Sequence, residues 1–507
     1  MRDKRIEAIT RRDFIRRAAC AAVGTVAMSA AIRDLRLMNA AVAQSNISDY
    51  KALVCIFLQG GDDSNNLIIP TVTSEYNNYA TVRTPILALP SASLQPLLTP
   101  GTSNNYVDAA GHTYGFHPAC PELAQLFNQG QLAVLLNAGT LVYPINRTQY
   151  LAKSISAPPQ LFSHADQQTQ WQTSLPDQPP TTGWAGRCAD LLNSIQPSAP
   201  ISLCISLAGS NTLEVGNIVT QYSVSTSGAI SLSGVSGARL AALTNLLGLQ
   251  YLNLQSKAYA GVAAHSINTG ALLNNAITNT IATNYWSTPF PATITPPTGG
   301  NAFNSALAPQ LKMVARLIEA GSRAAANGGF GMSRQIFFCQ VGGYDLHTGQ
   351  TNYTASNTNG VLTGAHSNLL AELSQSLLAF QSAMAQLNLA NKVTAFTASD
   401  FNRTFPSNGQ GSDHGWGSHH LICGGAGVSG GMQTGSVNGG QTFGTLPSLT
   451  VNGPDDTGTG RWIPTTATDQ YFATLATWFG VDPSNLSTVF PNLSRFKSPN
   501  LGFMNAS

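Results

Sequence analysis

Residues 52–66 read ALVCIFLQGGDDSNN, an unbroken apolar run that ends in two glycines and a group of polar residues. An apolar run of this length without polar alternation is typical of a strand buried on both faces, as in a parallel sheet. Five further short apolar runs have the same character, at residues 132–136, 201–207, 336–341, 393–398 and 421–423. Together the six runs predict a mainly parallel central sheet.

Segments between these runs have helical periodicity. Leu370, Leu373, Leu377, Met384 and Leu387 recur at spacings of three, four, seven and three, which places one apolar stripe on a helix within residues 366–391. Residues 117–128 form a second predicted helix, which ends just before a glycine and the next strand. Alternation of strands and helices indicates an α/β fold in which helices flank the sheet.

Three regions interrupt the alternation. Residues 71–116 are loop-rich with little periodicity, and residues 140–200 are rich in Gln, Pro and Ser. Residues 236–330 predict two long helices separated by a stretch of Pro, Thr and Gly. Because predicted strands resume after these regions, we expect one domain over residues 44–507 with three loop-rich or helical insertions.

The first 43 residues have the features of a twin-arginine export signal. Paired arginines at positions 11 and 12 precede an apolar pair and another base, an apolar stretch covers residues 18–32, and Ala41-Val42-Ala43 offers a cleavage site. Bases and an acid at residues 33–36 separate the apolar stretch from this cleavage site. The apolar stretch is shorter than the roughly 20 residues of a membrane span. We therefore expect no transmembrane span, recognition by the twin-arginine export machinery, and a periplasmic or secreted mature protein.

Charge and cysteine content narrow the function classes. The signal holds nine of the 25 basic and four of the 23 acidic residues, so 16 basic and 19 acidic residues remain without it, a net charge of −3 with His neutral. Without a basic excess, nucleic acid is not an expected partner. Six cysteines also remain, and none forms a CxxC pair. Several lie in apolar runs and predict buried free thiols, although an oxidising compartment also permits disulfides.

Polar residues follow the predicted strands one after another. GGDDSNN, GGYDLH (342–347) and SDFNRT (399–404) each come at or just after the end of an apolar run, whereas GSDHGWGSHH (411–420) precedes one. In open α/β sheets, ligands bind beyond the carboxyl ends of the strands. We therefore expect a convergent set at one edge of the sheet: Asp63, Asp345, His347, Asp400, Asp413, His414, and one of His419 and His420.

Carboxylate oxygens and imidazole nitrogens in one cluster suit one divalent metal ion or a pair. Zn, Mn, Mg and Ca are all compatible, because imidazole favours the transition metals and carboxylate favours the hard cations. The set contains no cysteine, which argues against a structural zinc site. The number of ions and their identity stay open at this point.

As a set, these motifs resemble a known family. Over most of its length the chain resembles the bacterial family called domain of unknown function 1501. The motifs that carry the resemblance are GGxD followed two residues later by Asn, GGYDLH, SDFNRT, SDHG, GFHPACPELAQLFNQGQLAVL and SHADQQTQWQT. That family is similar to the alkaline phosphatase and sulfatase superfamily, whose members bind one or two metals through Asp and His and hydrolyse phosphate or sulfate esters. The resemblance implies a fold and an activity of that type.

The resemblance places several residues at positions of the family pattern: Asp63 at its first Asp, Asp345 and His347 at its Asp-x-His, and Asp413 and His414 at its Asp-His pair. Three positions depart from the pattern. The family usually has Glu where Asp400 stands, and Gly where Asn402 and Ser64 stand. The shorter carboxylate of Asp400 changes the reach of that ligand.

A hydrolase of this kind needs a nucleophile and a group that holds the oxyanion. Ser163 is the first candidate nucleophile because it precedes a predicted helix, where backbone N–H groups favour an anion. A helix N-cap is its alternative role, and Ser64 is the second candidate. Arg403 can clamp a phosphate or sulfate through its guanidinium, or it can form an ordinary salt bridge.

Two function hypotheses follow. The first is an exported metal-dependent hydrolase of phosphate or sulfate esters, acting on a small-molecule or glycan ester. The alternative is a non-catalytic metal- or glycan-binding envelope protein that keeps the fold, which low charge and abundant Asn, Gln, Ser and Thr also suit. A redox enzyme is not supported, because the chain lacks a dinucleotide-binding fingerprint.

Overall fold

Strand β1 (Lys51–Leu58) lies inside a ten-stranded sheet, in the computed structural model that describes residues 49–193, 196, 199–229, 234–250, 254–278, 287–429 and 432–505. The proposed export signal and its cleavage site lie outside these residues. All eight residues of β1 are buried, as the apolar run predicts. Both faces of the sheet centre are therefore covered.

The sheet is mixed and mostly parallel, which confirms the predicted α/β fold. Its order is β16 (Thr442–Gly444), β5 (Leu132–Gly139), β13 (Ser418–Gly424), β12 (Val393–Ser399), β1, β11 (Arg334–Val341), β6 (Cys204–Ser206), β7 (Tyr222–Ser225) and β8 (Gly228–Ala229), with β17 (Thr466–Ala467) beside β5. β1 pairs in parallel with both β11 and β12. β13 runs antiparallel to β12 and to β5. The start of β13 therefore lies at the same edge as the end of β12.

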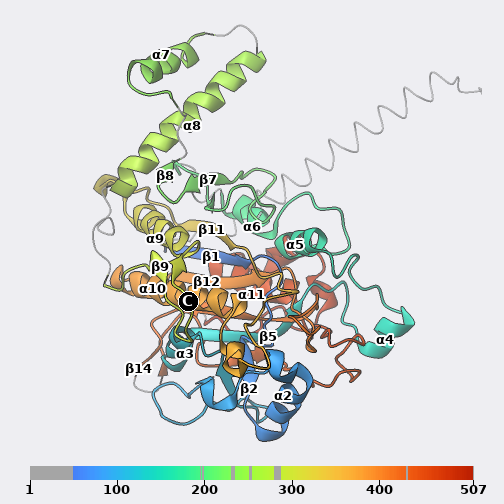
Figure 1. Cartoon of the computed structure of the whole chain (residues 1–507). Helices are drawn as coiled ribbons and strands as arrows, with labels where there is room; N and C mark the ends of the chain where they lie inside the picture. Colours follow the sequence, from blue (N-terminus) through green and yellow to red (C-terminus); the bar gives the residue numbers. More distant parts are fainter. Residues whose placement is uncertain are drawn as a thin grey trace, which may run out of the picture.

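Two groups of helices contact the sheet (Figure 1). The first comprises α3 (Pro121–Asn128), α9 (Ala308–Ser322) and α10 (Ala365–Gln386). The second comprises α5 (His164–Thr173), α6 (Trp184–Leu192) and α11 (Thr468–Phe479), and α12 (Leu486–Val489) packs against α6 and α11. Short sheets lie outside the main one: β2 (Ile68–Pro70), β3 (Gln95–Pro96) and β4 (Tyr114–Phe116); β9 (Thr293–Ile294) and β10 (Phe303–Asn304); β14 (Val428–Ser429) and β15 (Met432–Gln433).

The region 71–116 is more ordered than its sequence indicates. It contains α2 (Thr73–Leu87), a 15-residue helix kinked at Thr84, directly before Pro85. The buried residues of α2 are Tyr79, Arg83 and Leu87, spaced by four. Because an arginine occupies the middle of this buried stripe, the apolar periodicity that signals a helix is missing.

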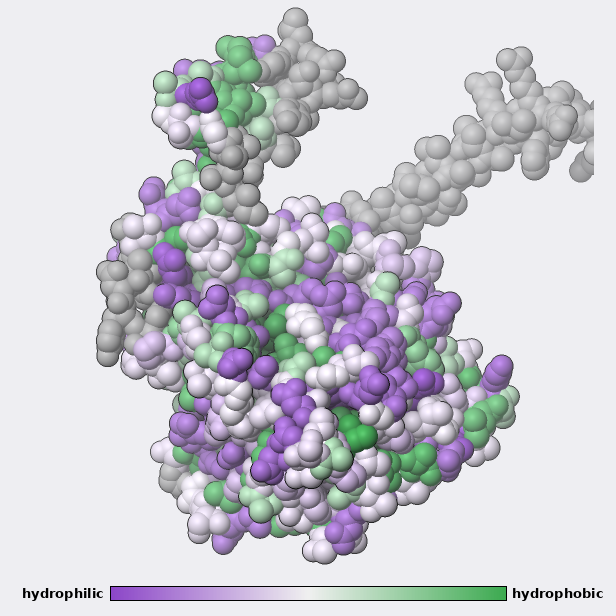
Figure 2. Space-filling model, in the orientation of Figure 1, coloured by the Kyte–Doolittle hydropathy of each residue, from purple (hydrophilic) through white to green (hydrophobic). Residues whose placement is uncertain are grey.

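The other two insertions are helical. Residues 140–200 contain α4 (Arg147–Ala152), α5 and α6, and residues 236–330 contain α7 (Ala238–Leu247), α8 (Leu254–Thr278) and α9, one helix more than the two expected. Helix α7 and the far part of α8 project from the rest of the molecule (Figure 1). Leu246 and Leu249 are exposed on this projecting part, and Figure 2 shows hydrophobic residues there.

Two further expectations concern thiols and the membrane. Six cysteines are buried and free, namely Cys55, Cys120, Cys188, Cys204, Cys339 and Cys423. Among the described residues, the structure contains no helix with the length and hydrophobicity of a membrane span.

Candidate metal centre

The ends of three strands and one helix meet at an edge of the main sheet. Asp345 and His347 follow β11, Asp400 directly follows β12, and His414 lies in the loop that leads into β13. His164 is the first residue of α5, which contacts β12. The antiparallel direction of β13 brings its preceding loop to the edge where the parallel strands end.

The carboxylate of Asp345 is the centre of this cluster. Its Oδ1 lies 3.1 Å from Nε2 of His347 and 3.2 Å from Nε2 of His414, and its Oδ2 lies 3.3 Å from Nε2 of His164. The three imidazoles therefore turn the same ring nitrogen toward one carboxylate. His164, Asp345 and His414 offer ligand atoms that all lie within 4.8 Å of one another, so this group could hold a metal ion.

An oxygen acceptor orients each of the three rings through its other nitrogen. Nδ1 of His164 lies 2.7 Å from Asp400, and Nδ1 of His347 lies 2.9 Å from Asp413. Nδ1 of His414 lies 2.8 Å from the backbone oxygen of Phe162. Ionised carboxylates and carbonyl groups only accept hydrogen bonds, so Nδ1 carries the proton in each ring. In the neutral rings Nε2 then presents a lone pair, the arrangement that fixes metal-ligating histidines in proteins.

Two of these lone pairs face each other. Nε2 of His347 and Nε2 of His414 are 2.9 Å apart, and both lie near Oδ1 of Asp345. A proton on one of the two rings, or a cation bound between them, would relieve this contact. Three imidazole nitrogens and a carboxylate are a donor set suited to a transition metal. The residues present therefore fit a metal ion.

The pKa values differ among these groups. The hydrogen bond to Asp400 raises the pKa of His164 above its ordinary value, although partial burial acts in the opposite direction. Burial lowers the pKa of His414, which keeps this ring neutral near pH 7. Burial favours a higher pKa for Asp345, but the hydrogen bond and charge of Arg403 outweigh it and lower the pKa. Asp345 is therefore ionised and His414 is ready to act as a ligand.

Arg403 holds Asp345 in place. Its Nη1 donates to Oδ1 of Asp345 at 2.7 Å and to the backbone oxygen of Gly60 at 3.2 Å, and its Nη2 donates to the backbone oxygen of Ser412. The side chain of Arg403 is fully buried. The guanidinium is thus engaged by protein oxygens, which fits the salt-bridge role considered for this residue.

Five of the seven predicted ligands lie together: Asp345, His347, Asp400, Asp413 and His414. Asp400 and Asp413 orient imidazole rings instead of facing the central carboxylate. Asp400 is buried and also accepts from the side chain of Gln168 at 2.9 Å and from the backbone of Gly60 at 3.2 Å. Asp413 is about half exposed.

Asp63 lies apart from this group. Its buried carboxylate forms an ion pair with Arg83 of α2 and accepts hydrogen bonds from Gln350 and Asn65. Burial favours a higher pKa for Asp63, but the charge of Arg83 outweighs it and lowers the pKa. The structure therefore places this carboxylate in an internal ion pair that joins α2 to the sheet edge.

The two histidines of β13 are buried. Nδ1 of His419 accepts a hydrogen bond from the backbone N–H of Asn137 at 3.0 Å, and burial lowers the pKa of His419 to about 4. The ring of His420 lies 4.7 Å from that of Trp171, and burial lowers its pKa to about 3. Both rings are neutral within the sheet core, and neither has a contact with Asp345 in the part of the chain that the structure describes.

Two serines were candidate nucleophiles. Ser163 precedes α5 as its N-cap residue, but its Oγ donates to the carboxylate of Asp166 at 2.6 Å and makes no capping hydrogen bond. Ser64 is fully buried, and its Oγ accepts from the backbone N–H of His419. Of the two, Ser163 is the hydroxyl that solvent and a substrate can reach.

His164 was absent from the predicted ligands, although it completes the cluster. Residue 164 does not follow a predicted strand, so the strand-end criterion passes over it. The signal that could have found it is the stretch SHADQQTQWQT, which contributed to the family resemblance and begins with Ser163 and His164.

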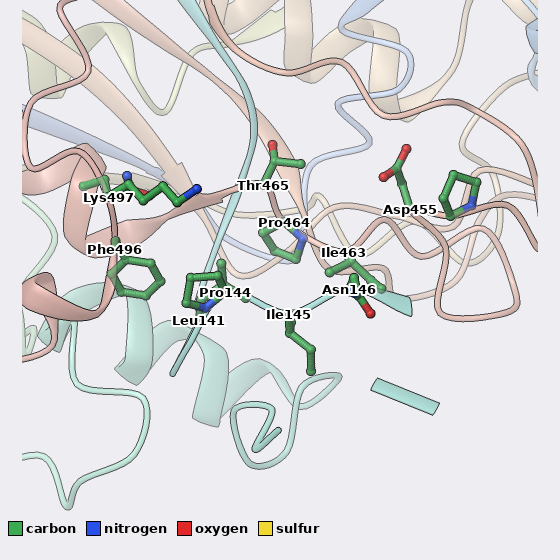
Figure 3. A pocket seen from close by; sticks show the side chains of 12 residues that line it. Leu141, Pro144, Ile145, Asn146, Asp455, Ile463, Pro464, Thr465, Phe496 and Lys497 are labelled. Carbon is green, nitrogen blue, oxygen red and sulfur yellow. The ribbon is translucent and has the colours of Figure 1, made fainter. Parts of the chain in front are cut away.

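A separate cavity of ≈ 360 Å³ shares no residue with the cluster. Figure 3 shows Pro144, Ile145, Pro464 and Phe496 on its walls, with Asp455 and Lys497 at its margins. Its lining is mainly apolar, in contrast to the cluster of imidazoles and carboxylates.

Comparison with known proteins places the chain in a family. The model of the family described as "Protein of unknown function (DUF1501)" matches residues 50–444, so the chain belongs to this family, as the motifs indicated. No curated protein matches. Two similar solved structures are those of Ps i-CgsB, one in complex with k-i-k-neocarrahexaose, at 8% and 7% identity, each with a TM-score of 0.31 and covering 89% of this chain and 77% of the other.

Proposed function

We propose that this DUF1501 protein is an exported metal-dependent hydrolase of phosphate or sulfate esters. One observation carries the proposal: three imidazole Nε2 atoms converge on the carboxylate of Asp345 at an edge that solvent reaches. The side chains of Asp345 and His347 are 44% and 43% exposed. Structural metal sites are closed by protein ligands, whereas catalytic sites keep a position open for water or substrate.

The ligands in this proposal are His164, His347, His414 and Asp345. The donor atoms of His164, Asp345 and His414 all lie within 4.8 Å of one another, and Nε2 of His347 lies 2.9 Å from Nε2 of His414. We therefore propose one ion, and three imidazoles favour Zn over Mg or Ca. Held by these four residues, a divalent ion would lower the pKa of a water molecule and would stabilise negative charge on the ester. Its charge also balances the cluster, which contains the carboxylates of Asp345, Asp400 and Asp413 and the Arg403 guanidinium that forms an ion pair with Asp345.

The residues around the ligands have supporting roles. Asp400, Asp413 and the Phe162 carbonyl keep each Nε2 directed at the ion, and Arg403 keeps the Asp345 carboxylate in position. Ser163 supplies the nucleophile in this proposal, because Asp166 lies within hydrogen-bonding distance and can accept its proton. The ester class rests on the similarity of the DUF1501 family to the alkaline phosphatase and sulfatase superfamily.

A second function is favoured by a specific observation. The buried guanidinium of Arg403 is already bonded to three protein oxygens and is not free to hold an anionic ester. This suits the alternative of a non-catalytic metal- or glycan-binding envelope protein. Metal retention without turnover of any ester would favour that reading.

Elemental analysis of the purified protein tests the metal centre first. We expect one equivalent of metal in the wild type and loss of metal in Asp345→Asn and His414→Ala. The matched control is His112→Ala, because His112 pairs with Glu75 outside the cluster. Hydrolysis of 4-nitrophenyl phosphate and 4-nitrophenyl sulfate then tests the activity. Folded wild-type protein that takes up neither Zn, Mn, Mg nor Ca contradicts the proposal.

Export rests on the sequence of the first 43 residues. Replacement of both Arg11 and Arg12 by Lys should retain the protein in the cytoplasm, because the pathway recognises the arginine pair. Cell fractionation of the two forms is the measurement, and a double-Lys variant that still reaches the periplasm contradicts twin-arginine export.

A further inference from the structure

A polar groove of ≈ 560 Å³ runs beside the candidate metal centre. One wall is a face of α5, the floor contains Gln59 and Gln340 at the ends of β1 and β11, and the other wall is the loop after β6. The lining residues are Gln59, Ala165, Gln168, Thr169, Gln172, Ala208, Ser210, Asn211, Thr212 and Gln340. Figure 2 shows hydrophilic residues gathered where Figure 1 places α5.

The chemistry of this lining is uniform. Eight of the ten residues carry an amide or a hydroxyl, two are alanines, and none carries an ionisable side chain. On α5 the groove residues are spaced by three, one and three, which places them on one side of the helix. Over this stretch α5 rises roughly 10 Å, so the groove has the length of a short oligomer and the volume of a ligand site.

Several amides have hydrogen-bonding capacity left. Oε1 of Gln172 accepts from the backbone N–H groups of Thr212 and Leu213, whereas its Nε2 has no partner among the described residues. Oε1 of Gln59 accepts from Nε2 of Gln340, and Nε2 of Gln59 is likewise without a partner in the described part of the chain. Each amide thus holds the groove together with one atom and keeps another for a ligand.

The groove is joined directly to the metal centre. Gln168 lines the groove and donates to Oδ2 of Asp400, the same oxygen that lies 2.7 Å from Nδ1 of His164. Ala165, also in the lining, directly follows His164 in α5. A ligand lying along α5 therefore has one end at the cluster.

We propose that the groove binds an uncharged saccharide chain, the part of the substrate that carries the ester hydrolysed at the metal centre. The reaction at the metal centre rests on the proposed function, whereas binding of the saccharide depends only on the groove. Amides donate and accept at once, as the vicinal hydroxyls of a sugar require. Sites built from such groups select ligands that satisfy them.

Other ligand classes fit the lining less well. Nucleic acid needs cations for its phosphates, and the groove has none. A lipid chain needs apolar walls, and the groove offers two alanines. Addition of an extended peptide as a further strand needs the side of an exposed strand, but here the strands β1 and β11 meet the groove at their ends.

Calorimetric titration of metal-free protein with neutral tetrasaccharides tests the groove. The probes are maltotetraose, cellotetraose, laminaritetraose and β-1,4-galactotetraose, each to about 10 mM, because a millimolar Kd is only about 4 kcal/mol of binding. Tetragalacturonate and tetra-alanine are the charged and peptide comparisons. We expect saturable binding of at least one neutral probe, and weaker or no binding of both comparisons.

Variants that fill the groove give the matching evidence. Ser210→Trp and Ala165→Trp replace exposed residues of the lining, and Ala242→Trp on the projecting α7 is the control. We expect Kd to rise at least tenfold in the two groove variants and to stay unchanged in the control. Absence of saturable binding by all neutral probes, preference for a comparison probe, or wild-type affinity in both groove variants overturns the proposal.

Hydrolysis of 4-nitrophenyl esters, which have no saccharide, separates this inference from the proposed function. Ester hydrolysis without saccharide binding refutes the groove and leaves the hydrolase. Saccharide binding that survives metal removal, with no ester hydrolysed, supports the groove and refutes the hydrolase.

Discussion

Replacement of Asp400 by Asn should weaken metal binding without removing a ligand. The Asp400 carboxylate accepts three hydrogen bonds, from Nδ1 of His164, from Nε2 of Gln168 and from the backbone N–H of Gly60. Asparagine has nearly the same shape but presents one oxygen and one NH₂ group. At least one of the three donors must therefore face another donor.

Both orientations of the new amide have a defined effect. If the NH₂ group faces His164, Nδ1 of that ring must become an acceptor, the proton moves to Nε2, and the metal-binding lone pair is lost. If the NH₂ group faces Gly60, a buried backbone N–H loses its partner, which costs about 1–3 kcal/mol of stability. Loss of such an orienting group lowers metal affinity about 10–100-fold. We therefore expect a Kd for Zn or Mn that is 10–100-fold higher in the first orientation, and a stability lower by about 1–3 kcal/mol in the second.

Metal titration by calorimetry and urea unfolding of the metal-free protein measure the two effects. Asp177→Asn is the control, because Asp177 also accepts hydrogen bonds, from Arg495 and Asn492, away from the cluster. Asp400→Asn protein that is as stable as the wild type and binds metal within about twofold of it would refute the assigned role of Asp400.

Three further predictions follow from the same structure. Arg83→Ala should lower the free energy of unfolding by about 3–5 kcal/mol, because it leaves the buried carboxylate of Asp63 without its ion-pair partner. The metal content should stay unchanged, and loss of metal would place Asp63 in the metal centre. Burial raises the pKa of Asp469 to about 7 from an ordinary 3.8, so the folded state holds this proton more tightly and the free energy of unfolding falls as pH rises from about 4 to 7. Asp469→Asn should remove this loss of stability, which is at most about 4 kcal/mol. Urea unfolding at pH 5 and pH 8 measures it, and the same pH dependence in both proteins contradicts the prediction. Ser163→Ala should lower kcat on an accepted ester by at least about 100-fold at unchanged metal content, whereas unchanged kcat identifies water as the nucleophile.

The sequence was sufficient for the central strands and for most of the polar cluster at the edge of the sheet. Apolar runs marked the central strands because both of their faces are buried, and the polar residues after those runs met because parallel strands end at one edge. The loop before β13 was also predicted to lie at this edge. Because β13 runs antiparallel to β12, the residues that precede β13 lie beside the end of β12.

Pattern alone could not identify the contribution of helices. His164 and Asp400 are 236 positions apart, and only the docking of α5 on the sheet brings them together. Asp63 resembled the other strand-end carboxylates, but its partner Arg83 comes from α2, a helix without apolar periodicity. Neither docking event leaves a local signal in the sequence.

The reversed direction of β13 affects how the centre assembles during folding. β12, the loop 400–417 and β13 form one hairpin-like unit, so Asp400, Arg403 and His414 approach each other through contacts that are short in sequence and fast to form. Asp345 and His164 must come from distant parts of the chain, and closing such long loops is slower. Full metal affinity should therefore arise only after α5 has docked, which makes bound metal a reporter of completed folding.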